Sequence, residues 1–444
     1  MYLKRKIDEF LLNWKEDISH KPLIIKGARQ IGKTESVLHF ANSAYSNVVY
    51  INFALDKRFR AIVSDGYDVD AVIRNISLAD MSLEFIPGET VIIFDEIQEY
   101  PDVATCLKSF NIDRRFDVIC SGSMLGINYK KIHSNSVGNK TDYEMYSMDF
   151  EEFLWAKGYK QEHIDDILSH MTAIRPFSET EMNVYKSLFL DYCVLGGMPD
   201  VVRSYIEKGT FSGTNALQEQ IRLDYEEDVR KYAEGLDPTK ILSVYRSVPS
   251  QLAKENKKFQ YNKIDKKARS REYTGCIEWL TDAGVIVECK CLGYPELPLK
   301  GNVEEGKFKL YYPDTGLLIS SLDEEAQEDF RINKNLGVYK GALYENLVAE
   351  AFIKQGLGLF YYKKENSTLE EDFFVRSKSE LLPVEVKSNN NRSKSLAALI
   401  KNENYSDIKN GIKLGDFNVG YEKNIYTFPY FCAFLIKAFV KNLD

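Results

Sequence analysis

Short apolar runs alternate with stretches of helical spacing over the first 150 positions of the chain. An opening helix is predicted because apolar side chains recur at that spacing, in Leu3, Ile7, Phe10, Leu11 and Trp14. Four apolar runs then predict buried strands, at residues 23–25, 48–51, 91–94 and 118–120. Strands that alternate with helices pack as a parallel sheet. We therefore expect an α/β parallel-sheet core in this part of the chain.

After residue 149 the pattern changes to longer helical stretches and later strands. Helices are predicted at residues 150–168, 179–229 (broken at 196–199), 241–252, 273–282 and 341–355. We expect Pro249 to interrupt its helix because proline lacks the backbone N–H donor. Strand signals lie at residues 285–287, 309–312, 359–362, 372–375 and 383–386. Helices followed by a small hairpin near residues 285–312 suggest a winged-helix module.

Length, charge and cysteine usage narrow the class of protein. The 444 residues suffice for about three domains of ~150 residues. The net charge is −8, so any DNA contact must come from a local basic patch. No apolar run approaches the ~20 residues of a membrane span, and no apolar signal core follows the N-terminus. Seven scattered cysteines without a CxxC pair indicate reduced thiols. We expect a cytoplasmic protein with no membrane partner and, since all five histidines lie at or before His170, no histidine chemistry in the C-terminal half.

The glycine-rich stretch after the first predicted strand fits the phosphate-loop pattern GxxxxGK[ST] in full. Glycines let backbone N–H groups curl around phosphate oxygens, and the following helix points its positive N-terminus at the anion. Lys33 adds a positive charge at the β/γ-phosphates, and Thr34 offers a hydroxyl to Mg²⁺. The predicted ATP-binding residues are Gly27, Ala28, Arg29, Gln30, Ile31, Gly32, Lys33, Thr34 and Glu35. The alternative is an ordinary glycine turn between a strand and a helix.

A second nucleotide motif lies at the end of the strand predicted at residues 91–94. An apolar strand followed by Asp95 and Glu96 is the Walker B pattern. Asp95 can hold Mg²⁺ through water, and Glu96 can polarise the attacking water as a catalytic group. Ser121, after the next strand, either senses the γ-phosphate or belongs to an ordinary Ser-Gly-Ser turn. Arg114 and Arg115 are candidates to supply transition-state charge in trans, although exposed arginine pairs are usually only solvated.

Acids near the C-terminus suggest a second site. Asp372 begins one strand, and Glu385 and Lys387 form an E-x-K on the next, where residues two apart face the same side. Asp372 and Glu385 can hold Mg²⁺ through oxygen ligands, with Glu345 on the preceding helix steadying the metal. Lys387 can then stabilise charge during phosphodiester cleavage. The alternative is an amphipathic hairpin with a solvated charged face.

A basic segment at residues 254–271 is a candidate DNA-contacting surface in this acidic protein. Phe259, Tyr261 and Tyr273 lie among or beside its basic residues. The alternative is a solubilising face between two helices. The basic residues are Lys254, Lys257, Lys258, Lys263, Lys266, Lys267, Arg269 and Arg271.

Strings from most of the chain resemble the prokaryotic AAA-type ATP-binding proteins whose C-terminal region has a winged-helix part and a PD-(D/E)xK nuclease-like end. The matching strings are residues 27–34, 95–98, 121–123, 148–154, 196–199, 314–318, 344–348 and 385–388. The resemblance implies ATP binding and hydrolysis with Mg²⁺, and it places the nuclease acids at Glu345, Asp372 and Glu385, with Lys387. Relatives typically have Val-Asp-Phe where this chain has an extra acid, Glu371, before Asp372.

Pattern and resemblance together predict four domains. They are an AAA-like P-loop core over residues 1–150, a helical lid over 151–235, a winged-helix-like domain over 236–325 and an α/β restriction-endonuclease-like domain over 326–444. The expected function is an Mg²⁺-dependent ATPase coupled to a DNA-directed, nuclease-like C-terminal domain. The alternative is a nucleotide-gated switch or scaffold whose nuclease-like domain only binds. AAA-like relatives often act between subunits, so a homo-oligomer is compatible with the sequence.

Overall fold

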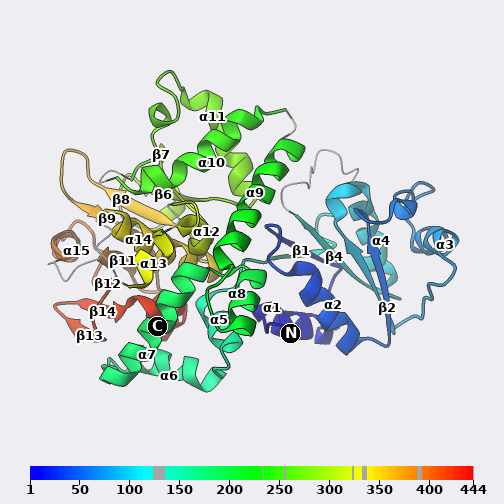
Figure 1. Ribbon diagram of the computed structural model, residues 1–444, viewed down its shortest axis with the longest axis horizontal. Helices are drawn as coiled ribbons and strands as arrows, with labels where there is room; N and C mark the ends of the chain where they lie inside the picture. Colours follow the sequence, from blue (N-terminus) through cyan, green and yellow to red (C-terminus); the bar gives the residue numbers. More distant parts are fainter. Residues whose placement is uncertain are drawn as a thin grey trace. The chain divides into compact units, whose positions relative to one another are not determined.

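The computed structural model describes residues 1–123, 136–233, 235–254, 257–322, 325–332, 338–387 and 393–443 (Figure 1). The chain forms two compact units. The N-terminal unit contains Lys4–Tyr146 and Asp282–Gly284, and the C-terminal unit contains Met1–Leu3, Ser147–Thr281 and Val285–Asp444. Among the described residues, no helix is both long enough and apolar enough to cross a bilayer.

A five-stranded sheet forms the centre of the N-terminal unit. Its strands are β1 (Leu23–Gly27), β2 (Asn47–Asn52), β3 (Thr90–Asp95), β4 (Asp117–Ser123) and β5 (Thr141–Glu144). Their order is β2-β3-β4-β1-β5, and every pairing is parallel. All residues of β3 are buried, as expected for a parallel strand covered on both faces. The predicted parallel α/β core is confirmed.

Helices cover this sheet through their apolar faces. The α-helices are α1 (Lys6–Glu16), α2 (Lys33–Ala44), α3 (Val69–Ala79) and α4 (Leu107–Asp113), and the 3₁₀ helices are η1 (Lys57–Phe59), η2 (Ile97–Glu99) and η3 (Pro101–Cys106). Asp68 caps the N-terminus of α3, and its carboxylate accepts a hydrogen bond from Ala71 N at 2.9 Å. Its residues Val69, Val72 and Ile76 then bury one stripe in the core of the unit.

The C-terminal unit begins with a run of helices. They are α5 (Phe150–Ala156), α6 (Gln161–Thr172), α7 (Glu179–Leu195), α8 (Pro199–Lys208), α9 (Thr214–Tyr232), α10 (Pro238–Leu252) and α11 (Ser270–Asp282). The single helix predicted at residues 150–168 was wrong, because Gly158, with φ 89°, follows the end of α5 and precedes α6. The predicted interruption at Pro249 was also wrong, since α10 continues to Leu252. Proline cannot donate to the carbonyl of Tyr245, and that carbonyl accepts the hydroxyl of Tyr312 at 3.1 Å instead.

Two further sheets and shorter helices complete this unit. The first sheet has the order β7-β6-β8-β9, and the second has the order β10-β11-β12-β14-β13. The strands are β6 (Val287–Leu292), β7 (Val303–Tyr311), β8 (Phe360–Lys363), β9 (Glu370–Glu371), β10 (Phe373–Arg376), β11 (Leu381–Lys387), β12 (Gly411–Gly415), β13 (Gly420–Glu422) and β14 (Ile425–Pro429). The helices are α12 (Thr315–Ile319), α13 (Ala326–Arg331), α14 (Val338–Lys354), α15 (Lys394–Ile400), α16 (Ile436–Asn442), η6 (Tyr261–Lys263), η7 (Leu299–Asn302) and η8 (Tyr430–Leu435).

The predicted hairpin near residues 285–312 is present but does not stand alone. β6 pairs antiparallel with β7 and, on its other edge, parallel with β8. The predicted winged-helix-like and nuclease-like segments therefore share one sheet. The divisions at residues 235/236 and 325/326 stay predictions.

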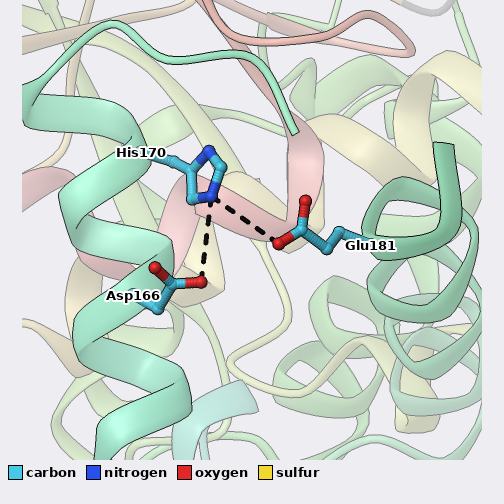
Figure 2. Close-up of side chains that lie close together, drawn as sticks. All are labelled: Asp166, His170 and Glu181. Carbon is cyan, nitrogen blue, oxygen red and sulfur yellow. Dashed lines mark ion pairs between the residues drawn. The ribbon is translucent and has the colours of Figure 1, made fainter. Parts of the chain in front are cut away.

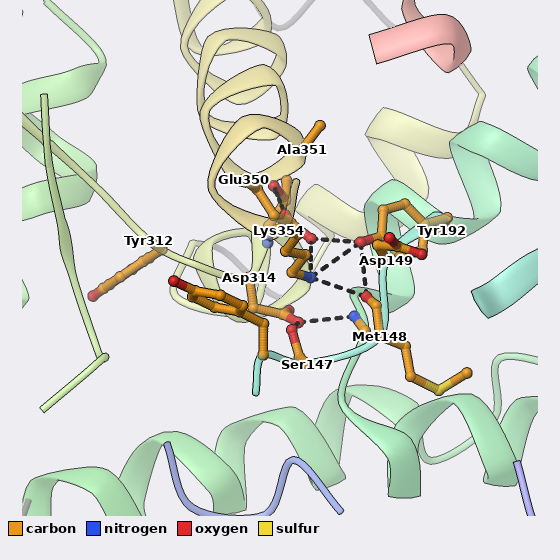
Figure 3. Close-up of polar contacts among 12 residues, drawn as sticks. Ser147, Met148, Asp149, Tyr192, Tyr312, Asp314, Glu350, Ala351 and Lys354 are labelled. Atoms are coloured by element: carbon orange, nitrogen blue, oxygen red, sulfur yellow. Dashed lines mark hydrogen bonds and ion pairs between the residues drawn. The ribbon is translucent and has the colours of Figure 1, made fainter. Parts of the chain in front are cut away.

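A buried polar network organises the C-terminal unit just after the chain leaves the N-terminal unit (Figure 3). Lys354 of α14 donates to Glu350 at 2.6 Å and to the carbonyl of Met148 at 2.9 Å. Asp314 accepts hydrogen bonds from Ser147 Oγ and from Gly197 N, both at 2.8 Å. Such fully partnered polar groups fix the way the elements pack. Four of the strings that carry the family resemblance (148–154, 196–199, 314–318 and 344–348) meet in or next to this network.

Candidate nucleotide-binding site

The phosphate-loop residues connect the end of β1 to the start of α2. Gly32 and Gln30 adopt left-handed backbone conformations, with φ of 91° and 63°, which turn the chain between the strand and the helix. Gly27 lies against the segment after β5, where a Cβ atom would be 2.2 Å from the carbonyl oxygen of Met145. This close approach explains why glycine is required at the first position of the loop.

Lys33 directs its ammonium group back over this loop. Its Nζ donates to the carbonyl of Gly27 at 3.0 Å and to that of Ala28 at 2.6 Å. Only 8% of the residue is exposed. Burial lowers the pKa of Lys33 to about 8, although the nearby carboxylates of Glu96 and Asp95 oppose that shift. The loop therefore holds a positive charge at the N-terminal end of α2, next to its own backbone.

Asp95 is the centre of the polar cluster at the end of β3. Its carboxylate accepts hydrogen bonds from Thr34 Oγ1 at 3.0 Å and from Ser121 Oγ. The predicted residues Thr34, Asp95 and Ser121 are thus brought together, because β4 lies between β1 and β3. Tyr50 and Asn52 of β2 also donate to Asp95, at 2.7 and 3.0 Å. Burial is the main reason that the pKa of Tyr50 rises to about 12.

The sequence analysis missed Tyr50 and Asn52 as site residues. Both come from the second predicted strand, and Asn52 is the register partner of Asp95 across the β2–β3 pair. The position of these polar residues at the carboxyl end of a predicted strand was a signal for the site, because the carboxyl ends of parallel strands meet at one edge of the sheet. Only the order of the strands, which sequence does not show, identifies β2 as the neighbour of β3.

Glu96 is held in an unusual backbone conformation beside Asp95. Its φ of 56° is left-handed, which is uncommon for a residue other than glycine. Its backbone N donates to Asp95 Oδ1 at 3.0 Å, and its carboxylate accepts from Gln98 Nε2. Gln98 also accepts from the backbone N of Ser123 at 3.1 Å. Gln98 therefore connects the predicted catalytic acid to the end of β4.

Arg5 is another contributor that sequence reasoning missed. One guanidinium nitrogen donates to the carbonyl of Ile31 in the phosphate loop, and the other donates to the carbonyl of Tyr146, both at 2.7 Å. Arg5 thus links the loop to the last residue of the main segment of the N-terminal unit. No local pattern marks this role, since its partners lie 26 and 141 positions away.

The remaining predicted residues occupy the loop and its surroundings. Arg29 lies within the loop, and Glu35 lies in the first turn of α2. Arg115 forms ion pairs with Asp113 at 2.8 Å and Asp70 at 2.6 Å. Arg114 is the residue that follows α4. That Arg114 or Arg115 supplies charge to the site of another subunit stays a prediction.

These groups fit a nucleoside triphosphate with a magnesium ion. The loop, the N-terminus of α2 and Lys33 supply the backbone and charged donors that phosphate oxygens require. Thr34 and Asp95 supply the hydroxyl and carboxylate oxygens that Mg²⁺ prefers. A bound Mg²⁺ would neutralise phosphate charge, and Glu96 is the carboxylate beside this pair that can orient a water molecule.

Fold and site together define a class, the P-loop ATPases. Residues 19–154 match the family model described as an AAA domain. The N-terminal unit is accordingly an AAA-type, ATP-binding P-loop ATPase domain. Two further matches lie largely within the C-terminal unit, both described as domains of unknown function: DUF8612 at residues 186–328 and DUF4143 at residues 340–432.

Several solved structures are similar to the chain at low identity. The Walker-type ATPase PABY2304 of Pyrococcus abyssi is 14% identical, with a TM-score of 0.44, over 72% of this chain and 96% of that one. The Aeropyrum pernix ORC1 protein in complex with DNA is 10% identical, with a TM-score of 0.28, over 74% and 91%. The Thermotoga maritima RuvB Holliday junction branch migration motor is 14% identical, with a TM-score of 0.29, over 64% and 87%. No curated protein matches the chain.

The predicted C-terminal acids fall into two groups, and the first surrounds a lysine that the sequence analysis did not assign to a site. Lys309 of β7, only 1% exposed, lies 3.0 Å from Glu345 and 3.9 Å from Asp372. Glu370 adds a third carboxylate at 3.2 Å. These carboxylates raise the pKa of Lys309 well above its usual value, although burial opposes the shift. The ammonium group of Lys309 is therefore surrounded by three carboxylates.

Glu345 is fully engaged by donors. It accepts from Lys257, from Lys309 and, at 2.5 Å, from the hydroxyl of Tyr311. Burial alone would raise its pKa, but Lys257 and Lys309 lower the pKa of Glu345 to about 2. Burial, together with the charge of Glu345, raises the pKa of Asp372 to about 6. Two lysines therefore balance the charge of Glu345, and its role as a metal ligand stays a prediction.

The second group contains the E-x-K pair. Lys387 Nζ lies 2.6 Å from Glu385 Oε1. Glu385 Oε2 and both carboxylate oxygens of Glu371 are buried without a hydrogen-bond partner among the described residues. Burial, and then the charge of Glu385, raise the pKa of Glu371 well above its usual value. The extra acid, Glu371, therefore belongs to this group.

The basic segment divides between buried and exposed side chains. Lys257 donates a hydrogen bond to Glu345. Phe259 and Tyr273 are buried, and the ring of Phe259 stacks on that of Phe308 with the ring centroids 5.5 Å apart. These two aromatic rings are core residues and are not open to nucleic-acid bases. The exposed basic residues are Lys263, Lys266, Lys267, Arg269 and Arg271.

Proposed function

We propose that the N-terminal unit hydrolyses ATP with Mg²⁺. The observation that carries this proposal is the hydrogen bonding of Thr34 and Ser121 to Asp95, next to the phosphate loop. Thr34 Oγ1 lies 3.0 Å from Asp95 Oδ2, so the hydroxyl and the carboxylate that we expect to bind Mg²⁺ are neighbours. Pre-organised ligands of this kind lower the cost of assembling the transition state.

The proposed roles follow from the contacts. The loop residues 27–34, with Glu35, bind the phosphates, and Lys33 neutralises the β/γ-phosphates. Thr34 and Asp95 hold the metal ion. Glu96, oriented by Gln98, accepts a hydrogen bond from the attacking water. Ser121 of β4 senses the γ-phosphate.

Glu96→Gln tests the catalytic role. The amide keeps the size of the side chain but is a poor base, so we expect ATP binding within about twofold of wild type and hydrolysis reduced by roughly 10²–10³-fold. Steady-state phosphate release and equilibrium nucleotide binding measure the two effects. Glu84→Gln, an exposed glutamate of the same unit, is the matched control. Equal turnover in wild type and Glu96→Gln would reject the role.

For the C-terminal unit the contacts support two functions. The unpartnered oxygens of Glu371 and Glu385 favour a cation site with Asp372, and hence phosphodiester cleavage assisted by Lys387. The lysines bound to Glu345 favour the alternative, a unit that binds DNA without cleaving it. We propose a DNA-directed unit in either case, because five exposed basic residues follow Lys257 in one short segment.

Incubation with Mg²⁺ or Mn²⁺ and single- or double-stranded DNA separates these two functions. Cleavage that is lost in Asp372→Ala and in Lys387→Ala supports the nuclease. DNA binding without cleavage supports the alternative. The absence of both would remove DNA from the proposal while leaving the ATPase intact.

A further inference from the structure

A histidine lies between two carboxylates where α6 is followed by α7 (Figure 2). Asp166 and His170 are one turn apart on α6, and Glu181 is in the first turn of α7. His170 Nε2 is 3.8 Å from Asp166 Oδ2 and 3.8 Å from Glu181 Oε1. Among the described residues, this is the only trio of His, Cys or acidic side chains whose ligand atoms all lie within 4.8 Å of one another. None of its members belongs to the nucleotide site or to the two C-terminal acid groups.

The ring of His170 is fixed with one nitrogen directed at the carboxylates. Its Nδ1 is 2.8 Å from the carbonyl oxygen of Arg175, which can only accept, so Nδ1 carries the hydrogen. In the neutral ring the lone pair is then on Nε2. The side chain is 5% exposed and stacks on Phe177, with ring centroids 4.2 Å apart. Metal-binding histidines are held in this way, by a backbone carbonyl on the nitrogen that does not bind the metal.

Each carboxylate uses one oxygen for a local contact and turns the other toward His170. Asp166 Oδ1 accepts from Arg175 at 3.1 Å. Glu181 Oε2 accepts from the backbone N of Ser178 at 2.7 Å, as part of the N-terminal cap of α7. Among the described residues, none lies within hydrogen-bond distance of His170 Nε2. Three ligand atoms therefore face one another with no hydrogen bond between them.

A plain ion pair does not explain this spacing. A protonated ring would form a hydrogen bond to one carboxylate at about 2.7–3.0 Å, whereas both separations here are 3.8 Å. In a tetrahedral zinc site with bonds of about 2.0–2.2 Å, neighbouring ligand atoms are about 3.3–3.6 Å apart. Small side-chain adjustments are enough to reach that geometry.

We propose that Asp166 Oδ2, His170 Nε2 and Glu181 Oε1 bind a divalent transition-metal cation. One imidazole nitrogen with two carboxylate oxygens suits Zn²⁺ and leaves a fourth position for water, whereas Mg²⁺ prefers oxygen ligands alone. The bound ion links the C-terminal half of α6 to the first turn of α7. Its binding stabilises this helix pair because the unfolded chain holds no preformed site.

Zinc binding to the tag-free, full-length chain tests the proposal. After treatment with a chelator, the protein is titrated with Zn²⁺ in competition with a chromophoric chelator, and with Co²⁺ to record the visible absorption of a low-symmetry site. We expect wild type to bind one Zn²⁺ that Asp166→Asn and Glu181→Gln each weaken at least tenfold. Glu181→Gln keeps an oxygen that can accept from Ser178, so the cap of α7 is preserved.

Asp165→Asn is the control, since it removes the same charge from the adjacent, exposed position of α6. It should bind Zn²⁺ like wild type, and all variants without metal should melt within about 2 °C of one another. Equal Zn²⁺ affinity in wild type and in both ligand variants would overturn the proposal. Equal weakening by Asp165→Asn and Asp166→Asn would also overturn it, because the attraction would then be general to the acidic surface.

Discussion

Lys33 brings a buried positive charge to the nucleotide site, and we expect ATP affinity to depend on its protonation state. Its ammonium group is buried against carbonyl oxygens of the loop, and this burial lowers its pKa to about 8. Phosphate oxygens would replace these carbonyls as partners and favour the charged form. The charged form of Lys33 is therefore partly lost above neutral pH, and we expect bound phosphate to raise its pKa again.

The pKa of Lys33 predicts how ATP affinity depends on pH. Binding needs the charged form, which is nearly complete at pH 7 and about one tenth populated at pH 9 if the pKa is about 8. We expect ATP affinity to be about tenfold weaker at pH 9 than at pH 7, measured with a fluorescent ATP analogue. Lys33→Arg, which stays charged, should bind with little change over this range. A flat profile for wild type would contradict the shifted pKa.

Among the elements of the C-terminal unit, the backbone at Met148, just before α5, packs directly against the backbone of the loop between α7 and α8. Met148 N donates to Gly197 O at 2.7 Å, and a Cβ on Gly197 would lie 1.8 Å from Met148 O. Lys354 of α14 binds the same carbonyl of Met148. The loop between α7 and α8 therefore has no room for a side chain at Gly197.

Alanine substitutions at two glycines test this packing. Gly197→Ala should destabilise the protein by about 1–3 kcal/mol or more, because backbone must move to admit the methyl group. Gly275→Ala is the control, since it lies within α11 with its nearest neighbour at 3.5 Å. It should be neutral or stabilise by up to ~1 kcal/mol through helix propensity. Urea unfolding measures both, and equal effects at the two positions would refute the packing argument.

At the scale of the whole molecule, the sequence predicted elements better than contacts. The strands of the N-terminal sheet and the site residues Lys33, Thr34, Asp95 and Glu96 follow from local apolar runs and motif spacing. Arg5 and Lys309 could not be found in this way, since their partners are brought close only by the fold. Lys309 stands in a strand, where a lysine is usually exposed, and only its burial among three acids reveals its role.

The net charge of −8 makes any DNA binding a local property of the chain. We expect Lys266→Gln/Lys267→Gln to weaken binding and to lower the slope of log affinity against log salt by about 2, because each phosphate contact releases roughly one counterion. Fluorescence anisotropy at several salt concentrations measures this slope. Lys208→Gln/Lys441→Gln removes the same charge from exposed positions elsewhere in the C-terminal unit. If both double variants change the slope equally, the basic segment has no special role.

Nucleotide binding by Lys33→Ala tests the central claim most directly. We expect wild type to bind ATP with Mg²⁺ and Lys33→Ala to bind it at least 100-fold more weakly, since the charge beside the phosphates is lost. Lys108→Ala, an exposed lysine of α4, should bind like wild type. Isothermal titration calorimetry on the three proteins decides the matter. Equal ATP affinity in wild type and Lys33→Ala, or no binding by wild type, would show that residues 27–34 are not an ATP-binding loop.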